Sequence, residues 1–222
     1  MKYNENGRSM VEMLGVLAII GVLSVGGIAG YSKAMNKYKI NKTTDQVSML
    51  VANIRTLFSS QGNYKGLNNA SAIRFGVVPN DMYTGTPAAD ATTYDISNAF
   101  NGAVTIEADA ARSGDTLAGQ KDAFVITYAG LSDEACVTVA TGDWGSGQAS
   151  GLIGIAAGKS GVTAGVKGVF VDSNTAAVAP AAEATVSIAA PGAANSTPMS
   201  VTNAVAVCSG GGSGNSVAWK YY

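Results

Sequence analysis

The chain has 222 residues, of which 47% are hydrophobic, and a formal net charge of −1. So small a charge argues against a nucleic-acid-binding domain, which usually carries a basic face. Histidine, the commonest general base and a common zinc ligand, is absent. Cys136 and Cys208 are too few for a thiolate metal cluster and too far apart for a CxxC redox pair. We therefore expect no cofactor, no metal site and no enzyme, although carboxylates alone leave acid–base chemistry open.

An apolar segment near the N-terminus is the strongest feature of the sequence. Twenty consecutive uncharged residues run from Met13 to Ser32. As a helix rising about 1.5 Å per residue, they match the roughly 30 Å hydrocarbon thickness of a bilayer. Three interpretations are open: a plain transmembrane anchor, a signal peptide cleaved at the small residues 27–29, or a helix that spans the membrane before assembly and packs against its own copies afterwards. The length of the segment argues against a signal peptide.

A carboxylate, Glu12, stands at the start of this segment. An acid inside a bilayer costs roughly 3 kcal/mol on insertion scales, so it usually indicates a function and a partner. The plainer alternative places Glu12 in the headgroup layer. The physics of the charge alone does not decide between the two.

The stretch G-RSMVE-MLGVLAIIGVLSVGGIAGY, residues 7–31, resembles the signature of type IV prepilins. In that family a membrane peptidase cuts after the glycine, and a glutamate stands fifth after the cut. Gly7, Arg8 and Glu12 have this spacing. The resemblance implies that cleavage frees the α-amino group of Arg8, usually N-methylated in the family, and that Glu12 pairs with this amine on a neighbouring subunit. Such a pair would give a buried carboxylate its opposite charge.

Three features depart from the family pattern. Arg8 stands where the family usually has an apolar residue, so its methylation does not follow from the resemblance. Ala29 stands where many relatives have a proline, whose absence is common in the larger type IVb branch. The leader, residues 1–7, is short for that branch.

The charges around the apolar segment conflict with the family topology. Four lysines follow the segment, whereas only Lys2 and Arg8 precede it, so the positive-inside rule alone would place the C-terminal side in the cytoplasm. The four are Lys33, Lys37, Lys39 and Lys42. We expect the opposite orientation, with the C-terminal side in the periplasm, because prepilins share it and because paired cysteines favour an oxidising compartment.

The helix is predicted to continue to about Ser60. Apolar residues recur there at three- and four-residue spacing, no proline occurs before Pro79, and Gly62 suits a helix stop. The stripe consists of Ile40, Val47, Leu50, Val51, Ile54, Leu57 and Phe58. We expect residues 8–32 to form the membrane and assembly part of the helix, and residues 33–60 an amphipathic part that packs on a core.

Five glycines lie in the apolar segment, at positions 15, 21, 26, 27 and 30. Each weakens a helix by about 1 kcal/mol relative to alanine. Two interpretations are open. The glycines allow close contact between helices through small residues, or they weaken a segment around residues 21–27 that unwinds on assembly.

Residues 61–222 are predicted to form a globular head. Strands are predicted at 103–108, 122–129, 166–171, 184–190 and 216–222. Ser132, followed by Asp133 and Glu134, indicates a helix N-terminus. The stretches QGNYKGL, NDMYTGTP and AFVITYAGLSDEAC, with a late cysteine before a short terminal strand, are similar to type IVb major pilins.

The resemblance implies a pilin fold of the α+β class, in which the long helix packs on an antiparallel sheet. A disulfide between Cys136 and Cys208 is expected, bounding region 136–208. The expected function is that of a major structural subunit of a type IVb-like pilus, which polymerises through its N-terminal helix into a surface filament for adhesion or aggregation. A minor pilin, a secretion pseudopilin and a membrane-anchored binding domain are the alternatives. Expected partners are further copies of the chain, the prepilin peptidase, the inner-membrane assembly machinery, and host or neighbouring-cell surfaces.

Overall fold

The computed structural model describes residues 10–112, 121–145, 150–159, 162–171, 184–188, 197–210 and 214–222. The chain divides into two compact units, Met1–Asn41 and Lys42–Tyr222. We call the second unit the head.

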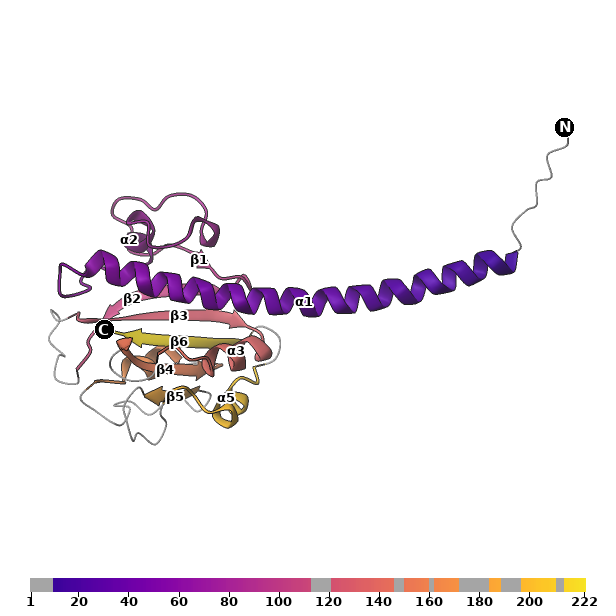
Figure 1. Cartoon of the computed structure of the whole chain (residues 1–222). Coiled ribbons are helices and arrows are strands. Elements are labelled where there is room, and N and C mark those ends of the chain that lie inside the picture. Colours follow the sequence, from indigo (N-terminus) through magenta and orange to yellow (C-terminus); the bar gives the residue numbers. More distant parts are fainter. Residues whose placement is uncertain are drawn as a thin grey trace. The chain divides into compact units, whose positions relative to one another are not determined.

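One helix, α1 (Met10–Phe58), contributes to both units (Figure 1). Its bounds agree with the predicted helix to within two residues at each end. The chain then turns, and Gly62 has φ +66°. This left-handed conformation is open to glycine at little cost and is common where helices end, so the expected stop is present.

Within the head, α1 turns its apolar stripe towards the sheet. Val47, Leu50, Ile54 and Phe58 are buried. They recur every three or four residues, which places them on one face of the helix. The last turn also contacts the sheet through Arg55, whose guanidinium lies 5.0 Å from the ring centroid of Tyr221.

The head contains one six-stranded antiparallel sheet with the order β1-β2-β3-β6-β4-β5 (Figure 1). The strands are β1 (Ile96–Ser97), β2 (Ala103–Asp109), β3 (Ala123–Leu131), β4 (Leu152–Gly158), β5 (Ala184–Ile188) and β6 (Asn215–Tyr221). The last strand in the sequence, β6, therefore lies inside the sheet between β3 and β4. Trp219 of β6 is opposite Ile126 on one side and Ile155 on the other, and all three are fully buried.

Four short helices and one 3₁₀ turn complete the described part of the head. They are α2 (Asn69–Arg74), η1 (Asn80–Met82), α3 (Asp133–Ala140), α4 (Val162–Lys167) and α5 (Val201–Val207). The predicted helix start at Ser132 is confirmed, because its hydroxyl accepts a hydrogen bond from the amide of Ala135 at 3.3 Å.

The strand predicted at 166–171 is wrong. Residues 162–167 form α4, and residues 168–171 belong to no strand. Val162, Val166 and Val169 share one buried cluster, and their spacing of four and three residues is that of a helix face. A six-residue apolar run such as VKGVFV does not distinguish the two structures by itself.

Six elements were not predicted: β1, β4, α2, α4, α5 and the 3₁₀ turn η1. All seven positions of β4, LIGIAAG, are buried, so the strand lacks the alternation that marks a half-exposed strand. Its glycines and alanines also make it look like the loops around it.

Candidate assembly surface and disulfide-bounded region

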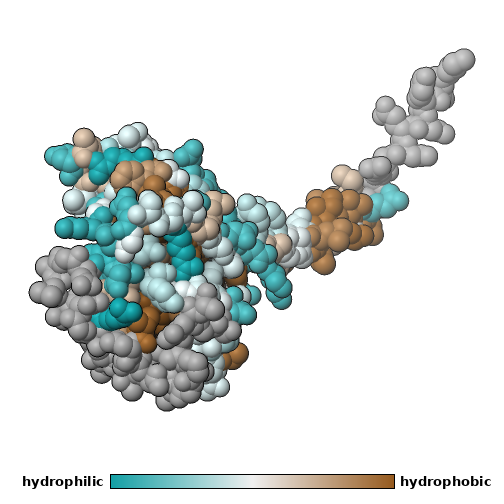
Figure 2. Space-filling view, turned by 60° about the vertical axis from the view of Figure 1, so that its left-hand side comes forward, coloured by the Kyte–Doolittle hydropathy of each residue, from teal (hydrophilic) through white to brown (hydrophobic). Residues whose placement is uncertain are grey.

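The N-terminal half of α1 presents a continuous apolar surface. Every large apolar side chain from Met10 to Ile28 is exposed, between 51% at Met13 and 82% at Met10. Figure 2 shows the hydrophobic colouring concentrated on this part of the helix. By length and composition the helix is able to cross a membrane. An apolar surface of this size marks contact with a membrane or with other protein chains.

Glu12 lies in the first turn of α1 and is exposed among these apolar side chains. Helix geometry places it on the same face as Val16 and Ile19. Among the described residues, no ion pair involves Glu12. Gly7 and Arg8 lie outside the described residues, so the cleavage junction, the methylation of Arg8 and the pairing of Glu12 remain predictions.

The five glycines of the apolar segment lie within an unbroken helix. A Cβ built on any of them would meet no atom within 4 Å. Contacts inside the single chain therefore do not require glycine there. Helix contact between copies and unwinding on assembly both remain predictions.

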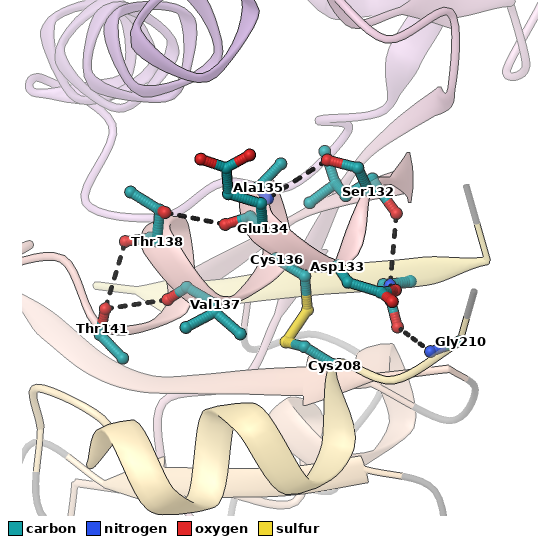
Figure 3. Close-up of a disulfide and its surroundings, with 12 residues drawn as sticks. Ser132, Asp133, Glu134, Ala135, Cys136, Val137, Thr138, Thr141, Cys208 and Gly210 are labelled. Atoms are coloured by element: carbon teal, nitrogen blue, oxygen red, sulfur yellow. Dashed lines mark hydrogen bonds between the residues drawn. A yellow bond between two sulfur atoms is a disulfide. The ribbon is translucent and has the colours of Figure 1, made fainter. Parts of the chain in front are cut away.

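In the head, a disulfide joins Cys136 of α3 to Cys208, the residue that ends α5 (Figure 3). The two Cα atoms are 5.7 Å apart, and the residues are 72 positions apart in the sequence. Both are buried. The expected disulfide is thus present, and it connects two helices that are distant along the chain.

Asn215 supports the backbone around this disulfide. Its side-chain amide donates to Asp133 Oδ1 at 2.6 Å, and its Oδ1 accepts from the amide of Gly210 at 2.9 Å. Asn215 itself is fully buried, and both interactions are partly buried. No motif in the sequence marked this residue.

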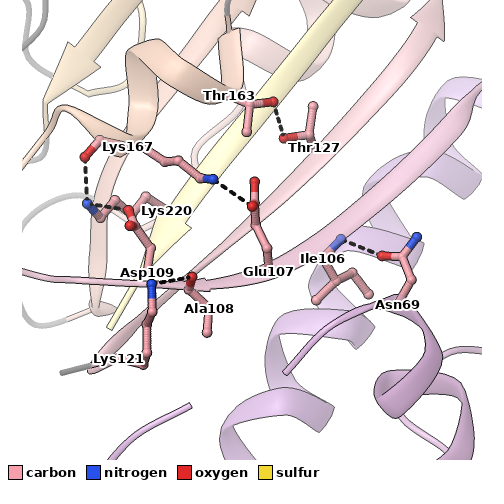
Figure 4. Close-up of polar contacts among 10 residues, drawn as sticks. All are labelled: Asn69, Ile106, Glu107, Ala108, Asp109, Lys121, Thr127, Thr163, Lys167 and Lys220. Atoms are coloured by element: carbon pink, nitrogen blue, oxygen red, sulfur yellow. Dashed lines mark hydrogen bonds and ion pairs between the residues drawn. The ribbon is translucent and has the colours of Figure 1, made fainter. Parts of the chain in front are cut away.

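Lys220 of β6 is a second feature that sequence patterns did not single out (Figure 4). Its ammonium is fully buried and lies 2.8 Å from Asp109 Oδ2. It also donates to the carbonyls of Lys167 and Val169 at 3.0 and 2.8 Å. Burial lowers the pKa of Lys220, and the hydrogen bond to Asp109 opposes that effect. The contacts fasten β6 to β2 and to the end of α4, which is a structural role. Strand alternation places Lys220 on the same face as the buried Ala218, the one sequence signal that could have found it.

Arg55 fastens the end of α1 to two strand ends. Its guanidinium donates to the carbonyl of Ser150 at 2.8 Å and to that of Tyr222 at 3.0 Å. Gly151 lies against it with φ +74°, and a Cβ at that position would collide with the guanidinium. The positive φ favours glycine there, and a Cβ would displace the guanidinium from its position.

A polar pocket of about 410 Å³ is lined by Thr84, Thr93, Tyr94 and Asp95. The hydroxyl of Tyr94 donates to the carbonyl of Thr84 at 2.6 Å. In the described ranges, no group of three or more cysteine, aspartate or glutamate side chains is arranged to hold a metal ion.

The chain has a long helix that is apolar in its N-terminal half and packs on an antiparallel sheet in its second half, and a disulfide bounds the C-terminal region. This is the architecture of a type IV pilin. A family model described as Bundlin matches residues 32–189, and the chain belongs to this family. The sequence resemblance to type IVb pilins is therefore confirmed. The family is one of structural subunits, and the chain is a pilus subunit.

Two solved structures similar to this chain are also pilins. TcpA, a type IV pilin from the Vibrio cholerae El Tor biotype, is 22% identical with a TM-score of 0.53, over 83% of this chain and 99% of that one. A type IVb pilin from Salmonella typhi is 18% identical with a TM-score of 0.48, over 82% and 97%. A comparison with curated protein sequences finds no match. At such identities the likeness to TcpA shows the fold, and the predicted α+β pilin fold is confirmed.

Proposed function

We propose that the chain is the major structural subunit of a type IVb-like pilus and polymerises through the N-terminal half of α1. The observation that carries the proposal is the exposed apolar surface from Met10 to Ile28, in a chain whose head is a pilin fold. These side chains are exposed along the helix. Lipid covers them before assembly, and other copies of the same helix cover them in the filament.

Maturation begins with cleavage between Gly7 and Arg8 by a prepilin peptidase. Glu12 then pairs with the freed α-amino group of a neighbouring copy. This is supported by the spacing of the three residues and by the place of Glu12 in the first turn of an apolar helix. The pair stabilises one register between neighbouring helices, because any other register leaves a carboxylate unpaired in an apolar environment.

Before assembly, residues 8–32 hold the subunit in the inner membrane with the head in the periplasm. The composition of α1 supports insertion, and the Cys136–Cys208 disulfide fits an oxidising compartment. Assembly machinery in the inner membrane then moves subunits into a filament on the cell surface. The filament serves adhesion to host or neighbouring cells, or aggregation.

Analysis of sheared surface fibres tests this function. The chain should be the most abundant protein in them, its N-terminal sequence should begin at Arg8, and deletion of its gene should remove the fibres. A trace amount in fibres built of another subunit would assign the chain to the minor pilins. Its absence from surface fibres would favour a secretion pseudopilin or an anchored binding domain. A start at Met1 or Gly30 would contradict the cleavage.

A further inference from the structure

We propose that Lys33 and Lys37, together with Tyr31 and Tyr38, bind the headgroups of anionic phospholipids at the periplasmic face of the inner membrane. We call these four residues the juxtamembrane surface. The inference rests on the proposed membrane-inserted subunit and adds a lipid class to it.

The four residues lie on one exposed side of α1. Tyr31 is 66% exposed, Tyr38 is 61% exposed, and both lysines are exposed. At 3.6 residues per turn, the four fall within an arc of about 160°. Lys33 and Lys37 are four residues apart, so their Cβ atoms are about 6 Å from each other and both ammonium groups can reach one phosphate.

The position of this surface along the helix matches the headgroup layer. The apolar segment ends at Ser32, and Lys33 is the next residue. Lys37 lies about 7 Å beyond Ser32 along the axis, and the headgroup region extends roughly 5 to 8 Å beyond the hydrocarbon. Tyrosine is enriched at this depth because its ring is apolar and its hydroxyl polar. Tyr31 and Tyr38 bracket the two lysines in the sequence.

The lysine charges lack a counter-charge from their own segment. No acidic residue occurs from Met13 to Thr44. Lys42 forms an ion pair with Asp81 at 2.6 Å, but no ion pair among the described residues includes Lys33 or Lys37. Like charges four residues apart weaken a helix. An anionic ligand between them would remove that repulsion.

This site also explains a conflict in the sequence. Lysines that follow a membrane span favour the cytoplasmic side, yet the head belongs in the periplasm for a pilin. Affinity for phosphate headgroups gives the lysines a role on the exported side. Each lysine near an anionic membrane surface strengthens association with that surface roughly fivefold. Loss of both lysines should therefore weaken association with anionic lipid by up to about thirtyfold at low salt.

Lipid selectivity of the full chain tests the proposal. The chain is reconstituted in phosphatidylcholine vesicles with spin-labelled phosphatidylglycerol or spin-labelled phosphatidylcholine, and electron paramagnetic resonance gives the ratio of the two association constants. We expect a severalfold preference for phosphatidylglycerol that is lost in Lys33→Gln/Lys37→Gln and kept in Lys33→Arg/Lys37→Arg. Lys65→Gln/Lys159→Gln removes two exposed lysines of the head and should keep the preference.

Several results would overturn the proposal: no preference in the native chain, an unchanged preference in the Lys33/Lys37 glutamine variant, or an equal loss in the Lys65/Lys159 variant. Fewer filaments with an unchanged lipid preference would assign the lysines to contacts between copies. Extraction of the vesicles with alkaline carbonate distinguishes failure of the lipid-binding proposal from failure of the proposed function. Release of the chain by carbonate would mean that it was never inserted, and this would overturn both the lipid-binding proposal and the proposed function.

Discussion

Leu14 and Leu50 are the same residue type on the same helix, yet Leu14 is 62% exposed and Leu50 is fully buried. In the head, α1 carries a stripe of apolar residues with polar residues beside it, and the sheet covers the stripe. From Met13 to Ser32 the helix is apolar on every side, and no single sheet could cover it. Burial in the head therefore stabilises the fold of the chain itself, whereas the N-terminal surface is left for lipid or other copies.

Charged side chains differ between the two units in the same way. Lys220 and Asp109 form a buried pair in the head, and Lys167 and Glu107 pair at 2.6 Å closer to solvent. Glu12 has no such partner among the described residues. Substitutions in the head should thus change unfolding, and substitutions in the N-terminal unit should change assembly. Trp144 and Trp219 both lie in the head, so tryptophan fluorescence reports on its unfolding alone.

The largest effect is expected from Glu12→Gln. Losing the carboxylate removes the proposed pair with a neighbouring α-amino group, so filaments in sheared preparations should fall more than tenfold. The urea midpoint of the purified chain in detergent should not move. Asp45→Asn, an exposed acid of α1 within the head, is the matched control and should leave filaments normal. Normal filament numbers in Glu12→Gln would remove the pairing hypothesis.

Breaking the disulfide should produce the largest loss of stability in the head. The bond closes a loop of 72 residues, which contributes about 4 kcal/mol in the chain-entropy model. Cys136→Ser and Cys208→Ser should each lower the free energy of unfolding by that amount, and the double variant should be no worse. Membrane insertion should be unchanged. Two alkylatable thiols in the native, unreduced protein would refute the disulfide.

A matched pair of leucine substitutions tests the comparison directly. Leu50→Ala should cost about 3 kcal/mol of unfolding free energy, because it leaves a cavity under the sheet. Leu14→Ala removes the same atoms from an exposed position and should leave the urea curve of the head unchanged. It should instead reduce filament yield. A shift of the head's midpoint by Leu14→Ala would mean that the two units are not independent.

Elements with a clear local period were predictable from the sequence, and those that depend on distant partners were not. The stripe of α1, the strands β2, β3 and β6, and the cap at Ser132 were all recognisable because their signals lie within a few residues. The strand β4 was hidden because both its faces are covered. Lys220 is satisfied by carbonyls 53 and 51 residues away, which no local pattern shows.

The same distinction between local and distant signals applies to the residues of the candidate site. Gly7, Arg8 and Glu12 were predicted through a resemblance that depends on spacing in the sequence, and their roles remain predictions. That Glu12 stands on an exposed apolar helix could be inferred from composition. The frame that Asn215 builds around the disulfide required the tertiary structure, since Asp133 and Asn215 are 82 residues apart.

A smaller effect should appear at high pH. Burial raises the pKa of Tyr128 above the usual 10.0. Between pH 10 and that raised pKa, the unfolded chain loses the proton that the folded chain keeps. Stability therefore falls as pH rises, by about 1.4 kcal/mol per unit for one such group.

Tyr128→Phe should make the loss of stability with rising pH less steep. It should change stability little at pH 7, because no hydrogen-bond partner of the Tyr128 hydroxyl is found among the described residues. Tyr38→Phe, an exposed tyrosine of the N-terminal unit, is the control and should leave the pH dependence as it is. Equal slopes in the native chain and in Tyr128→Phe would contradict the burial argument.

The smallest effect should come from the ion pair at the start of the head. Lys42 Nζ lies 2.6 Å from Asp81 Oδ2, but the Asp81 side chain is 49% exposed. Asp81→Asn should therefore cost no more than about 0.5 kcal/mol at pH 7, and less in 1 M salt. The hydrogen bond from Lys42 lowers the pKa of Asp81. The contribution of the Lys42–Asp81 pair to stability should thus be complete above about pH 4. It should be lost as pH falls through the lowered pKa of Asp81, where the folded carboxylate takes up its proton.

Asp90→Asn is a matched exposed control for Asp81→Asn. Urea unfolding at pH 7 and pH 3, each in low and high salt, measures the difference between the two variants. A loss above about 1 kcal/mol that salt does not reduce would show that this contact holds α1 to the head more firmly than its exposure implies.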